Sequence, residues 1–208
     1  MTKEEKLRNG FALPLMEDFY SLQGEGFHTG RAAYFLRIGG CDVGCSWCDV
    51  KESWDAALWP LTETDEIVGR VLDCPAKSVV ITGGEPLMYN LDYLCSVLKG
   101  SGFQLFLETS GSHPLSGKWD WICLSPKKFS PPLPELFNQA DEFKVIIRSV
   151  GDFDWAEKNM KKLNTTCKLF LQPEWSVREL IMEPVVEYVK THPHWRISLQ
   201  SHKYMKIP

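Results

Sequence analysis

The chain of 208 residues lacks the marks of several common protein classes. It has no apolar run near the ~18–20 residues that a membrane-spanning helix needs. Its first ten residues, MTKEEKLRNG, are charged and contain no apolar segment of a secretory signal. It also has no excess of positive charge, since the formal net charge is −4, which disfavours a generic electrostatic nucleic-acid binder. These absences predict a cytoplasmic protein with no membrane partner and no direct nucleic-acid partner.

A disulfide framework is missing as well, because the seven cysteines are odd in number and unevenly spread. Three of them crowd into one short stretch, and clustered thiols in a reducing compartment more often bind metal than pair with each other. The crowded cysteines are Cys41, Cys45 and Cys48. The other four are predicted to be core residues: Cys74, Cys95, Cys123 and Cys167.

Length and patterning predict one α/β domain, residues 1–208, with enough apolar sequence for a core. Short β-branched or aromatic runs alternate with helix-like segments, which implies a parallel sheet with helices outside. The expected strands are 33–38, 78–82, 103–108, 121–124, 142–147, 168–172 and 196–200. The expected helices are 63–73, 91–99, 152–163 and 177–190, the last broken or kinked at Pro184. Residues 130–134 are expected to form an irregular connection in place of a helix. Because a complete barrel takes ~250 residues, an incomplete barrel or a doubly wound sheet fits better.

Unusual polar motifs follow the expected strands at their carboxyl ends. They are residues 83–86, 109–111, 125–127, 173–174 and 201–203. In barrels and open α/β sheets, ligands bind at this edge. The five motifs therefore predict the rim of one site.

The crowded cysteines have the spacing C-x3-C-x2-C on one glycine-containing loop. Thiolates suit zinc or iron–sulfur clusters. A closed structural zinc site normally takes four ligands, and here no fourth Cys or His lies nearby in the sequence. Three ligands on a four-iron cluster would leave one iron open, whereas a zinc loop would need a distant residue to complete it.

This spacing, with the aromatic Trp47 before the third cysteine, resembles the signature of the radical S-adenosylmethionine superfamily. The resemblance implies that Cys41, Cys45 and Cys48 hold a 4Fe-4S cluster whose open iron binds S-adenosylmethionine. Reductive cleavage of that cofactor then gives a 5′-deoxyadenosyl radical, which abstracts hydrogen from the substrate. The second motif of the family, Gly-Gly-Glu-Pro, stands here at residues 83–86. Two glycines allow close backbone approach, and a carboxylate suits the cofactor's ammonium group.

The chain more closely resembles one subfamily, the 7-carboxy-7-deazaguanine synthase (QueE) family, over nearly its whole length. The motifs that carry this likeness are residues 19–26, Gly30, Phe35, Arg37, 81–86, 108–111, 125–127, 172–173 and 199–203. The resemblance implies a lyase that converts 6-carboxy-5,6,7,8-tetrahydropterin to 7-carboxy-7-deazaguanine with loss of ammonia, in queuosine and 7-deazapurine biosynthesis. It also implies an incomplete, modified TIM-like barrel of parallel strands with outer helices, a homodimer, and an external electron donor such as flavodoxin.

The resemblance also implies residue roles; the radical comes from the cofactor, so no separate catalytic residue is expected. Cofactor contacts are expected from Trp47, Cys48, Asp49, Gly83, Gly84, Glu85, Glu108, Ser110, Ser125, Pro126, Lys127, Gln172, Pro173, Glu174 and Trp175. Substrate contacts are expected from Leu22, Gln23, Gly24, Glu25, Arg37, Thr82, His202 and Pro208. The guanidinium of Arg37 suits the pterin carboxylate. The carboxylate of Glu25, as a pure acceptor, suits the pterin amino and ring N–H groups.

One position departs from the family pattern. Members that require magnesium commonly have Thr or Ser directly after Cys-Asp, whereas this chain has Val50. Magnesium demands oxygen ligands, which valine cannot offer, although Asp49, Glu52, Ser53 or water could compensate. We predict weak or absent magnesium dependence.

Two competing interpretations remain. A small glycyl-radical activating enzyme also carries C-x3-C-x2-C, but it lacks the motifs at the two ends of this chain and acts on a protein. A non-catalytic zinc or nucleic-acid-binding module would be colourless and would cleave no cofactor; the net charge and the lack of paired knuckles disfavour it.

Overall fold

The computed structural model describes residues 1–208, and its strands form one open sheet in the order β3-β1-β2-β4-β5-β6-β7-β8-β9. The strands are β1 (Ala12–Leu22), β2 (Ala32–Ile38), β3 (Leu61–Glu63), β4 (Ser78–Gly83), β5 (Gln104–Thr109), β6 (Trp121–Leu124), β7 (Glu142–Ile147), β8 (Lys168–Pro173) and β9 (Trp195–Ile197). From β2 to β9 the strands run parallel, whereas β1 is antiparallel to both β2 and β3. The edge strands β3 and β9 do not pair with each other, so the predicted incomplete, modified TIM-like barrel is confirmed.

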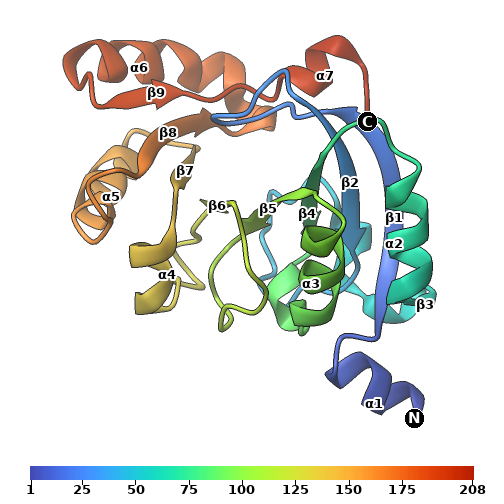
Figure 1. The fold of residues 1–208 in the computed structure, drawn as a ribbon. Coiled ribbons are helices and arrows are strands. Elements are labelled where there is room, and N and C mark those ends of the chain that lie inside the picture. The colour runs from blue at the N-terminus through green and yellow to red at the C-terminus, as the bar shows by residue number, and fades with distance from the viewer.

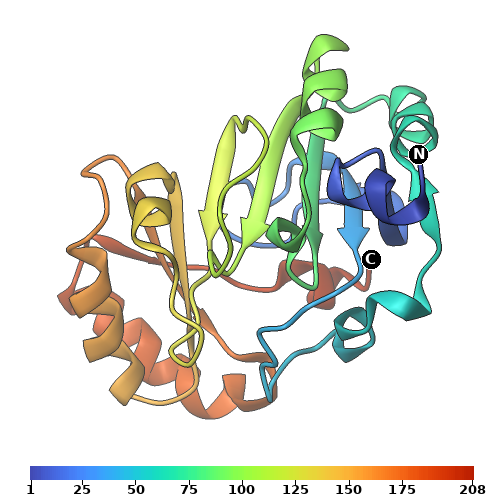
Figure 2. The same cartoon turned by 90° about the horizontal axis from the view of Figure 1, so that it is seen from below.

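The helices are α1 (Lys3–Arg8), α2 (Thr64–Leu72), α3 (Asp92–Gly100), α4 (Pro134–Gln139), α5 (Gly151–Met160), α6 (Arg178–Thr191) and α7 (Ser201–Met205). Helices α2 to α6 cover the outer face of this curved sheet, whereas α1 and α7 lie beyond the ends of the strands, as Figures 1 and 2 show. Helices α3, α5 and α6 pack on β5, β7 and β8 respectively. The chain end returns to β1, where the Ser21 hydroxyl donates to the Pro208 carbonyl at 3.2 Å (Figure 1). No helix is both long and apolar enough to span a bilayer.

Alternation along the strands separates the core from the concave face. Val79 and Ile81 of β4, and Val145 of β7, belong to the main core between sheet and helices. Because successive side chains of a strand point to opposite faces, Val80 and Lys144 lie on the concave side. Each buried strand can therefore present functional side chains without interrupting the core.

The long strand β1 is absent from the sequence prediction, and its pairing explains why. Its first part, from Ala12 to Pro14, pairs with β3, and its later part pairs with β2. Between Leu15 and Glu17 the register shifts, which leaves Met16 as an extra residue. The shift and the change of partner break the alternation on which a prediction from pattern depends.

Three further predictions differ from the structure. Strand β9 ends at Ile197 rather than at residue 200, because beyond Ser198 the chain turns away from β8 and the Ser201 amide donates to the Gly24 carbonyl at 2.9 Å. Helix α6 is not broken at Pro184: it continues through it. Pro184 removes only its own amide donor, and Leu180, whose carbonyl would have accepted that bond, is 81% exposed to water. Residues 130–133 form the irregular connection as predicted, but Pro134 then begins helix α4. The connection therefore precedes a helix instead of taking the place of one.

Candidate active site

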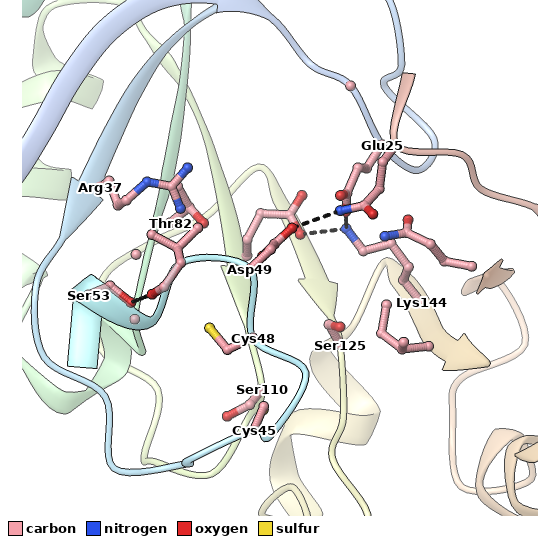
Figure 3. A pocket seen from close by; sticks show the side chains of 18 of the residues that line it. Glu25, Arg37, Cys45, Cys48, Asp49, Ser53, Thr82, Ser110, Ser125 and Lys144 are labelled. Atoms are coloured by element: carbon pink, nitrogen blue, oxygen red, sulfur yellow. Dashed lines mark hydrogen bonds and ion pairs between the residues drawn. The ribbon is translucent and has the colours of Figure 1, made fainter. Parts of the chain in front are cut away.

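Four strands place a polar side chain on the concave face near their carboxyl ends, and β7 places one there at mid-strand. They are Arg37 of β2, Thr82 of β4, Glu108 of β5, Lys144 of β7 and Gln172 of β8. With the loops that follow the strands, they line a cavity of about 550 Å³, part of which is drawn in Figure 3. The motifs predicted to form one rim therefore surround one cavity.

The cysteine loop leaves β2 and is closed by backbone hydrogen bonds. The Gly40 amide donates to the Ser53 carbonyl at 2.6 Å, and the Cys41 amide donates to the Trp54 carbonyl at 3.1 Å. Gly40 has a φ of +103°, a conformation that other residues rarely adopt. The two ends of the loop are therefore hydrogen-bonded to each other. Cys41, Cys45 and Cys48, which lie between these ends, all line the cavity.

The Gly-Gly-Glu-Pro segment packs directly against the start of this loop. A Cβ on Gly84 would lie 2.3 Å from the Gly40 carbonyl oxygen and 2.7 Å from the Cys41 Cβ. The Glu85 amide donates to that same carbonyl at 2.8 Å. The second glycine is therefore required by a close contact between two backbone segments, one of which carries the first cysteine.

Glu85 is an internal brace as well as a cavity residue. Its carboxylate accepts hydrogen bonds from the Thr109 hydroxyl (2.6 Å), the Ser110 amide (2.8 Å), the Ser110 hydroxyl (2.5 Å) and the Leu87 amide (3.1 Å). The residue is only 1% exposed. These bonds tie the end of β4 to the end of β5, and they orient the Ser110 hydroxyl at the cavity wall.

An ionic network forms another wall of the cavity, built from three segments of the chain. The ammonium of Lys144 lies 2.6 Å from a carboxylate oxygen of Glu25 and 3.0 Å from one of Glu108. The other oxygen of Glu108 accepts from the Gln23 amide at 3.2 Å. Figure 3 shows Lys144 and Glu25 joined at the cavity. We call Gln23, Glu25, Glu108 and Lys144 the ionic wall.

Burial and pairing act in opposite directions on these charges. Burial alone would raise the pKa of Glu25, but the nearby ammonium of Lys144 outweighs it and lowers the pKa to about 2. Burial likewise disfavours the charged form of Lys144, yet the surrounding Cys123 thiol and the carboxylates of Glu108, Glu25 and Glu142 hold its pKa well above the usual range. Glu25 and Lys144 are therefore both charged at neutral pH.

The remaining predicted substrate residues occupy the same cavity. The Arg37 Nε pairs with Glu17 at 2.6 Å, which leaves its terminal nitrogens without a partner in the chain. A Cβ on Gly24 would lie 2.2 Å from the His202 ring, so this glycine permits α7 to pack against the loop after β1. Burial lowers the pKa of His202.

Lys127 lines the same cavity as the three thiols. Its ammonium donates to the Ser125 carbonyl and, at 3.0 Å, to the Ser125 hydroxyl. Burial lowers the pKa of Lys127. Burial also raises the pKa of the Cys41 and Cys45 thiols, and the charge of Lys127 opposes that rise at Cys45.

A sequence profile described as "Radical SAM superfamily" matches residues 36–166, which include the cysteine loop and the segment that packs on it. A 7-carboxy-7-deazaguanine synthase of Flavobacterium psychrophilum is 53% identical over 100% of both chains. The chain belongs to the radical SAM superfamily and, within it, to the 7-carboxy-7-deazaguanine synthase family.

Two other members of this family support the assignment. The 7-carboxy-7-deazaguanine synthase of Synechocystis sp. is 47% identical over 93% of each chain. The crystal structure of QueE from Escherichia coli superposes with a TM-score of 0.82 at 29% identity, covering 97% of this chain and 99% of that one. The likeness thus extends over nearly the whole chain in both sequence and fold.

The donor set of this radical SAM chain fits an iron–sulfur cluster better than a single metal ion. No group of three His, Cys, Asp or Glu side chains is arranged to ligate one ion. Cysteine thiolates are the usual ligands of iron–sulfur clusters, so Cys41, Cys45 and Cys48 would hold one here. The loop has three thiols at one cavity, and the charge of the half-buried Lys127 acts on the thiol of Cys45.

Magnesium does not fit the residues beside the third cysteine. Val50 offers no side-chain oxygen, and the Ser53 hydroxyl donates to the Val50 carbonyl at 2.7 Å. The Asp49 carboxylate is held by the Lys203 ammonium at 2.6 Å and by the Gln200 amide at 3.2 Å. Burial alone would raise the pKa of Asp49, but Lys203 lowers it. An ammonium group of the chain therefore already neutralises the acidic group nearest to Val50.

All but one of the site residues predicted from sequence line the cavity. The exception is Pro126, which is buried and lines a smaller neighbouring pocket. Lining residues with no predicted role include Lys144, Lys203, Gln200 and Trp54. A usable signal existed for Lys144, because its strand reads EFKVII and alternation places both charged residues opposite Phe143, Val145 and Ile147.

Proposed function

We propose that this chain converts 6-carboxy-5,6,7,8-tetrahydropterin to 7-carboxy-7-deazaguanine with loss of ammonia, as a radical S-adenosylmethionine lyase of 7-deazapurine and queuosine biosynthesis. The observation that carries the proposal is that the cysteine loop shares one cavity with the polar side chains of the strands, namely Arg37, Thr82, Glu108, Lys144 and Gln172. A radical generated at the loop can then reach a substrate held by these side chains. Relatives named 7-carboxy-7-deazaguanine synthase along the full chain support the substrate.

In this proposal the thiols of Cys41, Cys45 and Cys48 hold the 4Fe-4S cluster. When bound, the reduced cluster and S-adenosylmethionine supply the organic radical that abstracts hydrogen from the substrate. The chain's part is to bind, orient and exclude water, as in other cofactor enzymes. The Ser110 hydroxyl, oriented by Glu85, and the loop holding Ser125 and Lys127 face the cofactor side of the cavity.

The substrate side of the cavity offers complementary groups for a carboxylated pterin. The free terminal nitrogens of Arg37 suit the substrate carboxylate, because a guanidinium can bind it with two hydrogen bonds. The ionised Glu25 accepts from adjacent N–H groups of the heterocycle. Gln23, Thr82 and His202 add neutral partners, and Pro208 brings the chain's end to the cavity.

The proposal also includes the wider setting of the enzyme. One domain, residues 1–208, carries the reaction; the continuous sheet supports this. An external one-electron donor such as flavodoxin reduces the cluster, since the chain has no flavin or haem motif of its own. We propose a cytoplasmic homodimer that uses a small-molecule substrate and no nucleic acid. Magnesium is not required, because of the residues around Val50.

The synthase reaction is favoured over both competing functions. A glycyl-radical activating enzyme acts on a protein, whereas the relatives along the whole chain are named for the synthase reaction. A zinc module would need four ligands arranged around one ion, and no group of His, Cys, Asp or Glu side chains has that arrangement.

The test is anaerobic reconstitution of the cluster, chemical reduction, and incubation with S-adenosylmethionine and carboxytetrahydropterin. We expect 7-carboxy-7-deazaguanine in the mass spectrum, together with 5′-deoxyadenosine. Cleavage of the cofactor without the deazaguanine would retain a radical enzyme and reject this substrate. A colourless protein that contains zinc would reject the proposal altogether.

A further inference from the structure

A buried lysine, Lys144, pairs with one expected substrate contact, Glu25, and with one expected cofactor contact, Glu108. The sequence motifs give this lysine no role. Lys144 lies mid-strand in β7, and its side chain is 4% exposed. A lysine this deeply buried is rare unless it is paired. Its two partners, Glu25 and Glu108, come from the loop after β1 and from the end of β5.

Lys144 is the one cation that either carboxylate has within 4.0 Å. Glu108 also accepts from the Gln23 amide at 3.2 Å, so it would keep a neutral partner on its second oxygen. The Glu25 carboxylate likewise has hydrogen bonds from two glutamine side chains. Removal of the lysine would therefore leave both carboxylates with neutral partners only, and it would take away the positive charge that keeps Glu25 ionised.

We propose that Lys144 is a positioning residue that holds Glu25 as an ionised acceptor for adjacent N–H groups of the substrate. A carboxylate that is ionised can only accept hydrogen bonds, whereas a protonated one donates. Lys144 thus selects for a heterocycle edge that presents N–H donors. The inference rests on the proposed function, because it concerns how the same pterin is recognised.

The charges around this pair are dense, and they favour this assignment over a purely structural one. Glu142 and Cys123 lie on β7 and β6, and His202, Asp49 and Lys127 face the pair from the loops and α7. The carboxylates of Glu25, Glu108 and Glu142 outnumber the one lysine that they share. Without Lys144, close carboxylates disfavour each other's ionised forms, and Glu25 loses its acceptor-only character.

The test compares Lys144→Met with the wild type in steady-state kinetics on the pterin and in cofactor cleavage without pterin. We expect the KM for the pterin to rise at least about tenfold, the cost of an unmatched buried charge contact. Cofactor cleavage without pterin should fall by less than the KM rises, because Glu108, the expected cofactor contact beside Lys144, keeps its hydrogen bond from Gln23. Lys168→Met is the matched control, since Lys168 is an exposed strand lysine in no ion pair, and we expect no change.

Three further variants separate positioning from folding. Lys144→Arg keeps the charge and should recover part of the lost kcat/KM, whereas Lys144→Gln should behave like Lys144→Met. In a double-mutant cycle with Glu25→Gln, the combined loss in kcat/KM should be smaller than the product of the single losses, because both changes remove one interaction. If Lys144→Met does not fold, the Gln and Arg variants still give this comparison.

The outcomes distinguish the two proposals. Product from the wild type with an unchanged KM in the Lys144 variants would overturn the inference and keep the proposed function. Multiplicative losses in the double-mutant cycle would also overturn it, since Lys144 would then act independently of Glu25. No product from the wild type would overturn the proposed function, and the inference with it.

Discussion

The cysteine loop and the ionic wall face each other across one cavity but are held in place by different forces. Backbone hydrogen bonds and close glycine contacts fix the loop, as at Gly40 and Gly84. Side-chain charges fix the ionic wall, as at Lys144 and Glu25. The difference teaches that one cavity can combine a steric scaffold, insensitive to pH, with an electrostatic one that depends on protonation.

The steric scaffold should fail on the smallest possible addition. In Gly84→Ala the new Cβ would lie 2.3 Å from the Gly40 carbonyl oxygen, so the backbone at Cys41 must move. A displacement of about 1 Å at a reacting group can cost about 10²-fold, and we expect a loss of that size in cofactor cleavage. The measurement is the rate of 5′-deoxyadenosine formation together with the iron content after reconstitution.

A matched control for this variant is Gly69→Ala. Gly69 is exposed in α2, and an added Cβ there would meet nothing within 4 Å. We expect its cleavage rate to be unchanged and its helix to be slightly stabilised, by about 1 kcal/mol. Equal rates for Gly84→Ala and Gly69→Ala would show that the loop tolerates displacement, and the contrast between the two sides of the cavity would disappear.

The charges around the ionic wall should instead make the stability of the fold depend on pH, and Glu142, which feels the charge of Lys144, is the clearest case. Glu142 is 3% exposed, and one carboxylate oxygen accepts from the Phe27 amide and the Trp121 indole while the other has no partner. Burial raises its pKa from 4.5 to about 7, although the charge of Lys144 opposes the rise. The folded protein therefore binds this proton more tightly than the unfolded chain does.

Stability from this proton is complete below pH 4.5 and is lost as the pH rises through 7. Glu142→Gln is neutral at every pH, so its free energy of unfolding relative to the wild type should improve by about 2 kcal/mol between pH 5 and pH 8. Denaturant titrations at several pH values measure this. Glu135→Gln, an exposed residue of α4, should show no such trend. If the difference in free energy of unfolding between Glu142→Gln and the wild type did not change with pH, the pKa of Glu142 in the wild type would be that of an ordinary glutamate.

The same contrast explains what could be predicted from the sequence. The cysteine loop and the Gly-Gly-Glu-Pro segment are contiguous, because backbone contacts require particular residues in a row. The ionic wall is assembled from separate segments, so Glu108 and Glu25 could be assigned only through motifs, and Lys144, which stands in no motif, was missed. Alternation on β7 would have placed it inward, but no local rule identifies its partners.

The fold divides in a similar way. Strands β4 to β8 were predicted within about a residue, because each is a short apolar run with a helix or loop on either side. Strand β1 was missed, since it pairs with β3 and then with β2 across a shift at Met16. Long-range pairing of this kind leaves no periodic pattern in the sequence.

The smallest effect is expected where the two sides of the cavity meet, at Asp49 and Val50. Asp49 follows the third cysteine, and Lys203 of α7 neutralises it at 2.6 Å. Because Val50 offers no side-chain oxygen and the Asp49 carboxylate is already paired, removing magnesium with a chelator should change the rate by less than about twofold.

The variant Val50→Thr has almost the same shape as the wild type and adds one hydroxyl oxygen, so we expect magnesium to stimulate this variant more than the wild type. A tenfold loss on chelation in the wild type, restored by magnesium, would contradict the prediction and require that Lys203 release Asp49 to the metal. The cysteine loop would then be connected to the substrate side of the cavity by a magnesium ion bound to Asp49, rather than by the ion pair between Asp49 and Lys203.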